Sequence, residues 1–371
     1  MDNCRDLWAE LCSYGNLVLA YKKARKHKTT KEYVLEFEKE LENNLLTLRS
    51  ELLLHCYQPR PLVHFIIRDP KTRKISKSTF RDRIVHHALC NVIEPIFEKS
   101  FIYDSYANRI GKGTLKAINR FDFFKRKSSK NNTVNSYILK GDIKKYFDNV
   151  DLLVLLSILR EKIGDRRIFW LIKKILNNYG HMIKGMPLGN LTSQFFANVY
   201  LNKLDGFVKH KLKVKYYLRY VDDFVILDSN KEKLESYKLQ IDEFLKSKLS
   251  IQLHEDKSKI YCLGDSMAFL GFRVFYYHKL LKKSNLNRLK KNFLFLKERY
   301  IRKEIDYEFI YNFIEGWVAY AKNASTYKFR QKFLKDFEGR FNGEISAKEI
   351  NAYRKTLQNI ILSQPKLHNS K

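Results

Sequence analysis

Two adjacent aspartates, Asp222 and Asp223, lie between the apolar stretches 216–218 and 224–227. Two apolar stretches joined by a short segment are typical of a β-hairpin, which would carry the acids near its turn. Neighbouring carboxylates resist joint ionisation, and a bound divalent cation relieves their repulsion. Aspartate is also common in ordinary turns, so a purely structural role stays open. Burial of the hairpin on both sides favours the metal site, because buried charge needs a counter-charge.

A third acid, Asp142, ends the apolar strand expected at residues 137–142. With Asp222 and Asp223 it would complete a set of three carboxylates. Such a set suits two Mg²⁺ ions about 3.5–4 Å apart, with Mn²⁺ as a substitute, as in nucleotidyl transfer. One ion lowers the pKa of an attacking hydroxyl, and the other balances the charge of a triphosphate leaving group. These three residues are therefore the candidate catalytic and metal-binding site.

The segments that position these acids mix helices and strands without regular alternation. Apolar residues recur at helical spacing over residues 7–55, and a basic β-hairpin is expected over residues 62–80. Further helices are expected at residues 81–98, 151–160, 165–178, 190–211 and 231–248 and from residue 285 onward, with a polar loop at 128–135. Strands are expected at residues 137–142, 258–263 and 268–276, and residues 214–228 should form two strands joined by a tight turn. This pattern predicts an α+β fold.

The composition indicates a folded protein that binds nucleic acid. Lys and Arg number 71 against 40 acidic residues, a net charge of +31 in 371 residues. Such an excess attracts polyanions through counterion release. No apolar run approaches the ~20 residues that span a bilayer, which makes a membrane partner the weaker alternative. The five cysteines form no Cys-x-x-Cys pair and no secretory signal is visible, so a cytoplasmic protein without zinc or disulfides is expected.

Several segments, in order along the chain, resemble the motifs of reverse transcriptases. Residues 220–223 resemble the palm hairpin of that family, and residues 137–148 resemble the strand with its first catalytic aspartate. Further likenesses lie at residues 62–87 and 101–117 (fingers), 189–193, 254–260 and 269–272 (primer grip). The resemblance extends over roughly residues 57–280. It implies a right-hand polymerase with fingers, a palm with an antiparallel sheet and a helical thumb.

The resemblance also implies how the chain divides. An N-terminal helical extension would occupy residues 1–56, fingers with part of the palm 57–136, the palm 137–280, and a helical thumb with a C-terminal tail 281–371. The primer grip would lie at Leu270 and Gly271. The thumb residues expected to bind nucleic acid are Arg288, Lys290 and Lys291.

The same resemblance gives roles to residues near the acids. Arg73 and Arg68 would bind the triphosphate of a dNTP, because guanidinium geometry suits phosphate. Phe147 would act as a steric gate against ribonucleotides. Lys257 would contact the dNTP as a general acid toward pyrophosphate. Plain alternatives stay open: solvated charges for the arginines, core packing for Phe147, and simple exposure for Lys257.

The segment from Leu188 to Gln194 departs from the usual family pattern. Most reverse transcriptases have Gln before Gly189 and Pro after Ser193, whereas this chain has Leu188 and Gln194. In that form it resembles the enzymes of diversity-generating retroelements, which copy a template-repeat RNA into cDNA with errors at adenines. Leu188, Gly189 and Gln194 would contact the dNTP. Because leucine cannot hydrogen-bond, part of the check on base geometry is lost and low fidelity is expected. Ordinary packing of Leu188, compensated by Gln194, is the alternative.

The retroelement branch implies several partners. They are the template-repeat RNA, the cDNA/RNA duplex, dNTPs and an oligomeric accessory variability protein. A group II intron-like or abortive-infection reverse transcriptase without targeted mutagenesis is the nearest alternative. A catalytically silent RNA-binding protein on the same fold is the alternative of another class. It predicts loss of one of the three aspartates, all of which are present.

Overall fold

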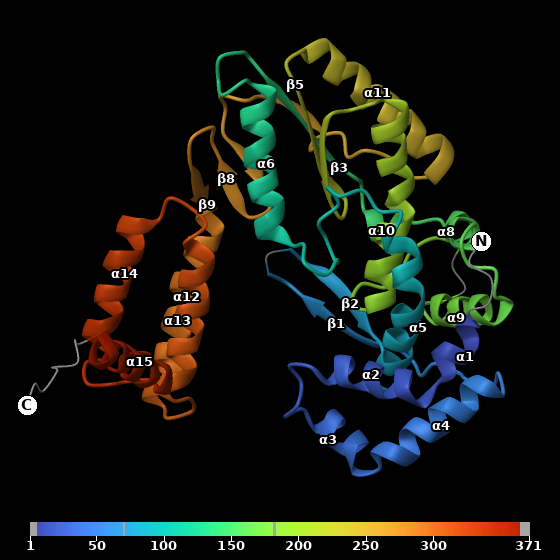
Figure 1. The fold of residues 1–371 in the computed structure, drawn as a ribbon, viewed down its shortest axis with the longest axis horizontal. Helices are drawn as coiled ribbons and strands as arrows, with labels where there is room; N and C mark the ends of the chain where they lie inside the picture. The colour runs from blue at the N-terminus through green and yellow to red at the C-terminus, as the bar shows by residue number, and fades with distance from the viewer. Residues whose placement is uncertain (1–5, 70, 181–182, 364–371) are drawn as a thin grey trace, which may run out of the picture. The chain divides into compact units, whose positions relative to one another are not determined.

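The computed structural model describes residues 6–69, 71–180 and 183–363 (Figure 1). The chain divides into two compact units, Met1–Cys262 and Leu263–Lys371, and each has a hydrophobic core of its own. The domain boundaries expected at residues 56, 136 and 280 stay predictions. Both units mix helices and strands, as the α+β prediction requires. Within the described residues, no helix is both long and apolar enough to cross a bilayer.

The N-terminal region consists of the helices α1 (Leu7–Cys12), α2 (Tyr14–Arg25), α3 (Glu32–Lys39) and α4 (Leu41–Leu53). Helix α1 begins after Asp6, whose carboxylate accepts hydrogen bonds from the backbone N–H groups of Trp8 and Ala9. This satisfies donors that the first turn of a helix leaves unpaired. Leu17 of α2 and Leu48 of α4 are fully buried. Helix α2 packs along α5 (Phe80–Glu98), and the helices predicted over residues 7–55 are confirmed (Figure 1).

The strands β1 (Val63–Ile67) and β2 (Arg73–Lys77) form the predicted antiparallel hairpin. Residue 70, part of the expected turn, lies outside the described residues. All side chains of β1 are exposed, whereas Ser76 of β2 is buried. The hairpin is therefore anchored through β2, and β1 faces solvent.

A four-stranded antiparallel sheet lies in the first unit, in the order β4-β5-β3-β6. Its strands are β3 (Tyr137–Asp142), β4 (Tyr216–Tyr220), β5 (Asp223–Asp228) and β6 (Lys259–Cys262). Gly141 of β3 lies opposite Phe224 of β5. A Cβ at Gly141 would come within 2.1 Å of the Phe224 ring, which is fully buried. Only glycine lets the ring pack directly on β3.

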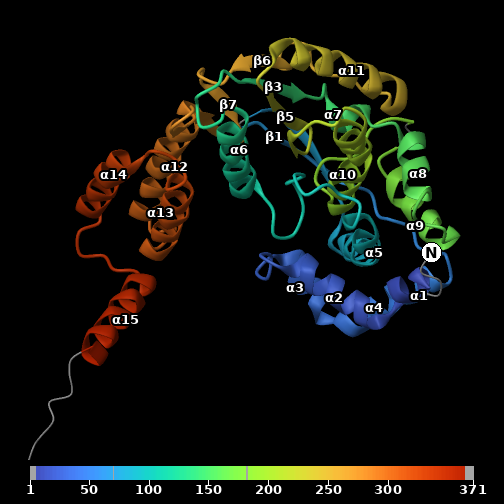
Figure 2. The same cartoon turned by 45° about the horizontal axis from the view of Figure 1, so that its top comes forward.

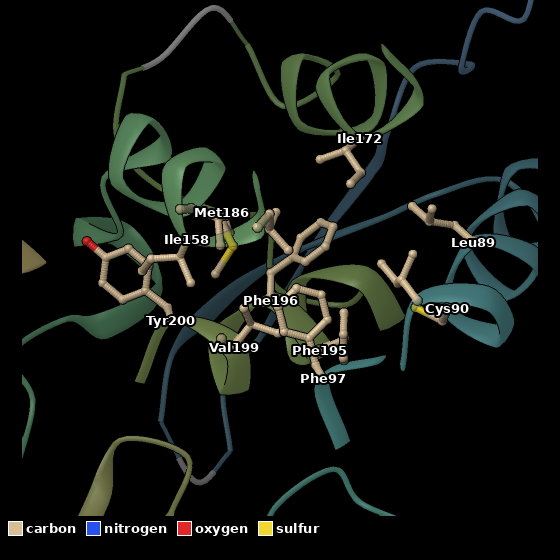
Figure 3. Packing of buried hydrophobic residues seen from close by; sticks show 14 of the residues in the cluster. Leu89, Cys90, Phe97, Ile158, Ile172, Met186, Phe195, Phe196, Val199 and Tyr200 are labelled. Atoms are coloured by element: carbon tan, nitrogen blue, oxygen red, sulfur yellow. The ribbon is translucent and has the colours of Figure 1, made fainter. Parts of the chain in front are cut away.

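The remaining elements of the first unit are α6 (Thr114–Ser128), α7 (Tyr146–Asn149), α8 (Leu152–Arg160), α9 (Arg166–Asn177), α10 (Leu191–Gly206), the π-helix η1 (Phe207–Lys211) and α11 (Lys231–Leu249). Helix α11 packs against β3, β5 and β6, and α6 packs against β4 and β5 (Figure 2). In the core, Phe195 and Phe196 of α10 lie beside Phe97 of α5 and Ile158 of α8 (Figure 3). Helix α6 was not predicted.

The second unit contains the antiparallel strands β7 (Met267–Phe269), β8 (Phe272–Val274) and β9 (Lys279–Leu281) and the helices α12 (Lys283–Ile301), α13 (Tyr307–Ala321), α14 (Tyr327–Arg340) and α15 (Ala347–Ser363). The single strand predicted at residues 268–276 is wrong. Leu270 and Gly271 have φ of +45° and +91°, and left-handed residues reverse the chain between β7 and β8. Aromatic side chains dominate the helical core, including Phe293 and Phe337.

Candidate active site

The central sheet brings the three aspartates to one end. Strands β3 and β5 are antiparallel, and their register places Asp142 directly opposite Asp223. Asp222 precedes Asp223 in the turn between β4 and β5. Leu139 of β3 and Ile226 of β5 are paired and fully buried, and a slip of one residue would place one of them on the opposite face of the sheet. This pair, together with Gly141 opposite the buried Phe224, holds the two acids opposite each other.

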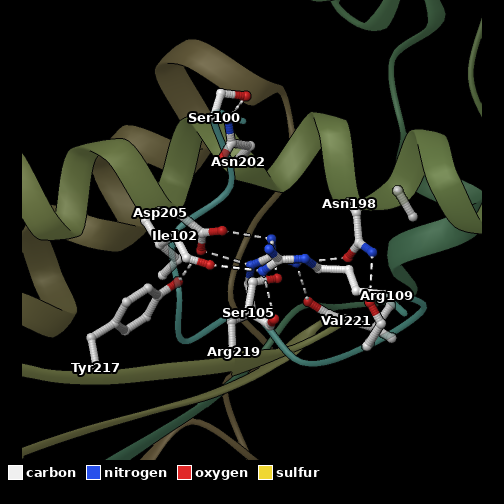
Figure 4. Close-up of polar contacts among 12 residues, drawn as sticks. Ser100, Ile102, Ser105, Arg109, Asn198, Asn202, Asp205, Tyr217, Arg219 and Val221 are labelled. Carbon is white, nitrogen blue, oxygen red and sulfur yellow. Dashed lines mark hydrogen bonds and ion pairs between the residues drawn. The ribbon is translucent and has the colours of Figure 1, made fainter. Parts of the chain in front are cut away.

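The turn that carries Asp222 is tight and strained. Tyr220 pairs with Asp223, so only Val221 and Asp222 lie between the two strands. Val221 has φ of +55°, a left-handed conformation that is unfavourable for a β-branched residue. Such a conformation persists when surrounding contacts hold it. One contact comes from Arg219, whose Nη1 donates to the carbonyl oxygen of Val221 at 3.1 Å (Figure 4).

Arg219 is itself fixed by a buried polar network beneath the turn (Figure 4). Its Nε and Nη2 donate to the two carboxylate oxygens of Asp205 on α10 at 2.7 and 2.6 Å, and both side chains are fully buried. Asn198 and Ser105 accept further bonds at 3.3 Å, and the Tyr217 hydroxyl donates to Asp205 at 2.7 Å. Burial lowers the pKa of Arg219, but the Asp205 carboxylate outweighs it and raises the pKa above its usual value. The charged pair thus connects α10 to the turn that carries Asp222.

The electrostatics of the turn reflect crowded negative charge. Burial, followed by the charges of Asp223 and Asp142, raises the pKa of Asp222 to about 6. The positive charge of Arg73 acts in the opposite direction, so β2 lies close enough to affect the turn. A bound cation would relieve the same repulsion.

The donor set fits a hard divalent cation, because carboxylate oxygens are the ligands that Mg²⁺ prefers. After burial, the charges of Asp223 and Asp142 contribute to the raised pKa of Asp222, so both carboxylates lie within electrostatic range of it. Within the described residues, no group of three His, Cys, Asp or Glu side chains is already gathered as a metal site. Lys257 instead contacts Asp142, with Nζ 3.1 Å from Oδ1. The charge of one acid is thus partly offset by a lysine that is itself half-exposed.

The two arginines predicted to bind triphosphate lie at the end of the β-hairpin. Arg73 begins β2 opposite Ile67, and Arg68 follows directly after β1. Both are exposed. Arg73 lies close enough to the acidic turn for its charge to lower the pKa of Asp222. Among the described interactions, Arg68 has no comparable effect on that pKa. Their binding of a nucleotide stays a prediction.

Phe147 and Leu188 are both half-buried. Phe147 lies in α7, five residues after Asp142, and packs against the main core. Its carbonyl oxygen accepts a hydrogen bond from the N–H of Met186 at 2.8 Å. The carbonyl oxygen of Leu188 accepts one from the N–H of Ser76 at 2.8 Å. The segment around Leu188 is therefore attached both to α7 and to β2.

Gly189 and Asn190 hold the segment around Leu188 against the β-hairpin through close packing and hydrogen bonds. Gly189 has φ of +117°, and a Cβ there would lie 2.7 Å from a methyl group of Ile75. Asn190 is buried; its side-chain oxygen accepts from the backbone N–H and hydroxyl of Ser78 at 2.8 and 2.9 Å. Its amide donates to the carbonyl oxygen of Ser76 at 3.0 Å. Gly189 and the exposed Gln194 line a cavity of about 400 Å³ whose lining does not include the three aspartates.

A sequence model described as reverse transcriptase (RNA-dependent DNA polymerase) matches residues 68–274, more than half of the chain. The chain belongs to the reverse transcriptase family. The matched segment contains the three aspartates, the hairpin arginines and the loop at Leu188. It is the domain type of RNA-directed DNA polymerases, and such domains use divalent metal ions. The right-hand polymerase architecture expected from the sequence is thereby confirmed.

This reverse transcriptase is similar to proteins of bacteria and yeast. It is 28% identical to Protein YkfC of Escherichia coli (strain K12), over 62% of this chain and 71% of YkfC. It is 26% identical to Group II intron-encoded protein LtrA of Lactococcus lactis subsp. cremoris, over 59% of this chain and 47% of LtrA. It thus spans about half the length of LtrA. The structure of apo telomerase from Candida tropicalis aligns with 61% of this chain and 49% of that chain, at 15% identity and a TM-score of 0.48.

The second unit of the reverse transcriptase carries the other predicted site residues. Leu270 and Gly271 form the turn between β7 and β8, and the carbonyl oxygen of Gly271 accepts hydrogen bonds from Asn285 at 3.2 Å and Tyr320 at 3.4 Å. Tyr320 thus supports this turn as well as packing on Phe272. Arg288, Lys290 and Lys291 lie on α12, and the two lysines are exposed. Primer and nucleic-acid binding by these residues stay predictions.

Two supports of the reverse transcriptase site were not predicted from the sequence. Arg219 stands inside an otherwise apolar strand, and a charged residue there signals a buried partner. The sequence does not identify Asp205 as this partner, because Asp205 lies on a helix and Arg219 on a strand, and only their packing brings the two side chains together. Asn190 follows Gly189 directly, but a single asparagine in a loop carries no signal of its own.

Proposed function

We propose that this chain is an RNA-directed DNA polymerase that copies RNA into cDNA, with Asp142, Asp222 and Asp223 holding two Mg²⁺ ions. The observation that carries the proposal is the register of Asp142 with Asp223, beside an Asp222 whose pKa is raised to about 6. Bound ions would activate the primer hydroxyl and balance charge on the leaving group. Mn²⁺ would substitute for Mg²⁺. A cytoplasmic location accords with the scattered cysteines.

The side chains around the acids would bind and orient the nucleotide. Arg73, whose charge acts on Asp222, would hold the triphosphate, assisted by Arg68. Lys257 lies beside Asp142 and would deliver a proton to the departing pyrophosphate. Phe147, five residues after Asp142, would exclude a ribose 2′-hydroxyl.

The loop at Leu188 is the evidence for error-prone copying. The carbonyl oxygen of Leu188 is hydrogen-bonded to β2, the strand that begins with Arg73. The leucine is therefore held in a fixed position relative to the arginine that would bind the triphosphate. A side chain without polar groups cannot hold a base by hydrogen bonds, and such contacts supply a few kcal/mol of discrimination at most. We therefore assign the chain to a diversity-generating retroelement. Its template would be a template-repeat RNA, its errors would fall at template adenines, and an oligomeric accessory protein would assist it.

Sequencing of cDNA from a defined RNA template tests this assignment. The wild-type enzyme should misincorporate mainly at template adenines, and Leu188→Gln should lower that rate by about tenfold or more. Leu239→Gln is the matched control, since Leu239 is 73% exposed on α11. Equal error rates in the wild type and Leu188→Gln would reject the assignment and leave the polymerase proposal intact.

A second candidate is a group II intron-like reverse transcriptase without targeted mutagenesis. The similarity to LtrA, a group II intron-encoded protein, favours it. On this alternative, errors would be spread over all four template bases, and the Leu188→Gln exchange would not change their distribution. The same sequencing experiment therefore separates the two candidates.

A further inference from the structure

The last two side chains of β4 are held by different helices. Successive side chains of a strand point to opposite faces of the sheet, so those of Arg219 and Tyr220 diverge. Arg219 is bonded to Asp205 of α10. The hydroxyl of Tyr220 lies 3.0 Å from the Oγ1 hydroxyl of Thr114, the first residue of α6. The strand that leads into the turn with Asp222 is therefore held from both faces of the sheet.

Tyr220 shares its face of the sheet with two of the three acids. It is paired with Asp223 of β5, and Asp223 is paired with Asp142 of β3. Directly opposed residues of antiparallel strands project from the same face, with Cβ atoms only about 4.5–5.5 Å apart. Tyr220 also directly precedes Val221, whose φ of +55° lies in the turn. A shift of Tyr220 would therefore move the neighbouring acids as well.

Thr114 is itself well anchored, because the segment before it is attached to the edge of β4. Ser105 forms a parallel bridge with Arg219. The N–H of Tyr106 donates to the carbonyl oxygen of Arg219 at 3.0 Å, and the N–H of Gly113 donates to that of Tyr106 at 2.9 Å. Gly113 has φ of +107°, a conformation that favours glycine and lets the chain turn into α6. These contacts hold Thr114 beside the strand.

Helix α6 is fixed near its other end too. The ring of the buried Phe124 lies 5.5 Å from that of Tyr216, the first residue of β4, between centroids. Tyr216 and Tyr220 are four residues apart and so lie on the same face of the sheet. Between these two contacts, α6 packs against β4 and β5 (Figure 2). Thr114 is therefore positioned by a helix that contacts both ends of the strand.

We propose that Thr114 is a positioning residue for nucleotide addition. Its hydroxyl holds Tyr220, and through Tyr220 the turn that brings Asp222 and Asp223 to Asp142. Without this hydroxyl the three acids are less well ordered for a divalent cation, so the cation binds more weakly and a higher concentration compensates. The role in nucleotide addition rests on the proposed function, whereas the effect on the turn does not.

Primer extension by the full chain over a range of Mg²⁺ concentrations tests the proposal. Thr114→Val keeps the shape and removes the hydroxyl, so the Mg²⁺ concentration for half-maximal rate should rise by about threefold to tenfold, the range that one hydrogen bond supplies. Thr114→Ser keeps a hydroxyl and should stay within about twofold of the wild type. A rate that is restored by Mg²⁺ separates this effect from a loss of folded protein.

Thr133→Val is the matched control, because the Thr133 hydroxyl donates to the carbonyl oxygen of Lys130 at 2.8 Å in an exposed loop. Its Mg²⁺ requirement should equal that of the wild type. An equal requirement in Thr114→Val would overturn the proposal. So would a Thr114→Ser enzyme as impaired as Thr114→Val, because a serine hydroxyl would then fail to replace the one that was removed.

A double-mutant cycle tests whether the two hydroxyls act together. Tyr220→Phe removes the other partner of the 3.0 Å contact and should raise the Mg²⁺ requirement as much as Thr114→Val does. The double variant Thr114→Val/Tyr220→Phe should be no worse than either single variant, because a broken contact cannot be broken twice. Effects that multiply in the double variant would show independent roles and refute the proposal.

Hydrogen–deuterium exchange in EDTA tests the turn without any catalysis. The backbone N–H groups of residues 221–223 should exchange about threefold to tenfold faster in Thr114→Val and in Tyr220→Phe than in the wild type or Thr133→Val. If Thr114→Val fails to fold, Tyr220→Phe supplies the same test. Faster exchange beside a wild type that makes no cDNA would reject the polymerase proposal alone. Unchanged exchange beside a wild type that makes cDNA would reject the role of Thr114 alone.

Discussion

The buried pair of Arg219 and Asp205 makes a quantitative prediction about stability. Arg219→Met leaves the Asp205 carboxylate, which is fully buried, with the Tyr217 hydroxyl at 2.7 Å but without its cationic partner. Removal of one partner of a buried ion pair costs about 3–5 kcal/mol, because the other charge stays desolvated. Whole domains are stable by only about 5–15 kcal/mol, so the loss should be plain.

The double variant Arg219→Met/Asp205→Asn separates stability from catalysis. An asparagine at 205 is neutral and still accepts the hydrogen bond of Tyr217, so at least about 2 kcal/mol of the loss should return. Polymerase activity should not return. The carbonyl oxygen of Val221 still lacks the donor that Arg219 supplies at 3.1 Å, and the left-handed turn that carries Asp222 loses that contact.

Urea unfolding and primer extension on an RNA template measure these two quantities. Lys203→Met is the matched control, because Lys203 lies on the same helix and pairs with Glu161 on the exposed surface. Surface pairs contribute about 0–1 kcal/mol, so this variant should remain near wild type in both assays. The reasoning fails if Arg219→Met costs less than about 1 kcal/mol, or if the double variant polymerises like the wild type.

Three further predictions concern acid stability, the sugar gate and the sheet. Burial lowers the pKa of His86 to about 4, so His86 is neutral in the folded protein. The unfolded chain binds a proton at this residue below pH 6.5, so the free energy of unfolding is unaffected above pH 6.5 and decreases as the pH falls from 6.5 through 4. Replacement by Gln should therefore reduce the acid-induced loss between pH 7 and pH 4 by about 3 kcal/mol, measured by urea unfolding at both pH values. Phe147→Ala should raise ribonucleotide incorporation relative to deoxynucleotides by about tenfold or more in primer extension, and equal discrimination would argue against a gate. Gly141→Ala should cost about 1–3 kcal/mol in urea unfolding, because its Cβ would lie 2.1 Å from the buried Phe224 ring; an unchanged midpoint would contradict this close packing.

The parts of the site that depend on local pattern were predictable from the sequence. The apolar runs of β3, β4 and β5 place the three aspartates at one end of a sheet, and the structure has Asp142 opposite Asp223. The hairpin at residues 62–80 follows from the same kind of pattern. Such features are set by side chains that are close in sequence, which is why spacing alone indicates them.

The supports of the site depend on contacts between distant segments. Asp205 meets Arg219 only once α10 packs on the sheet, and Asn190 meets Ser78 only once the loop packs on the hairpin. The reversal at Leu270 was missed because a leucine with positive φ contradicts its own local preference.

Primer extension on a defined RNA template is the most direct test of the proposed reaction. With Mg²⁺ and dNTPs the wild-type chain should extend a primer, and EDTA should abolish extension. Asp222→Asn should reduce the rate by at least about 100-fold, because charge stabilisation by metal ions contributes several kcal/mol. The variant should bind single-stranded RNA as the wild type does. Synthesis that survives Asp222→Asn unchanged, or no cDNA from the wild type on any RNA template, would contradict the account.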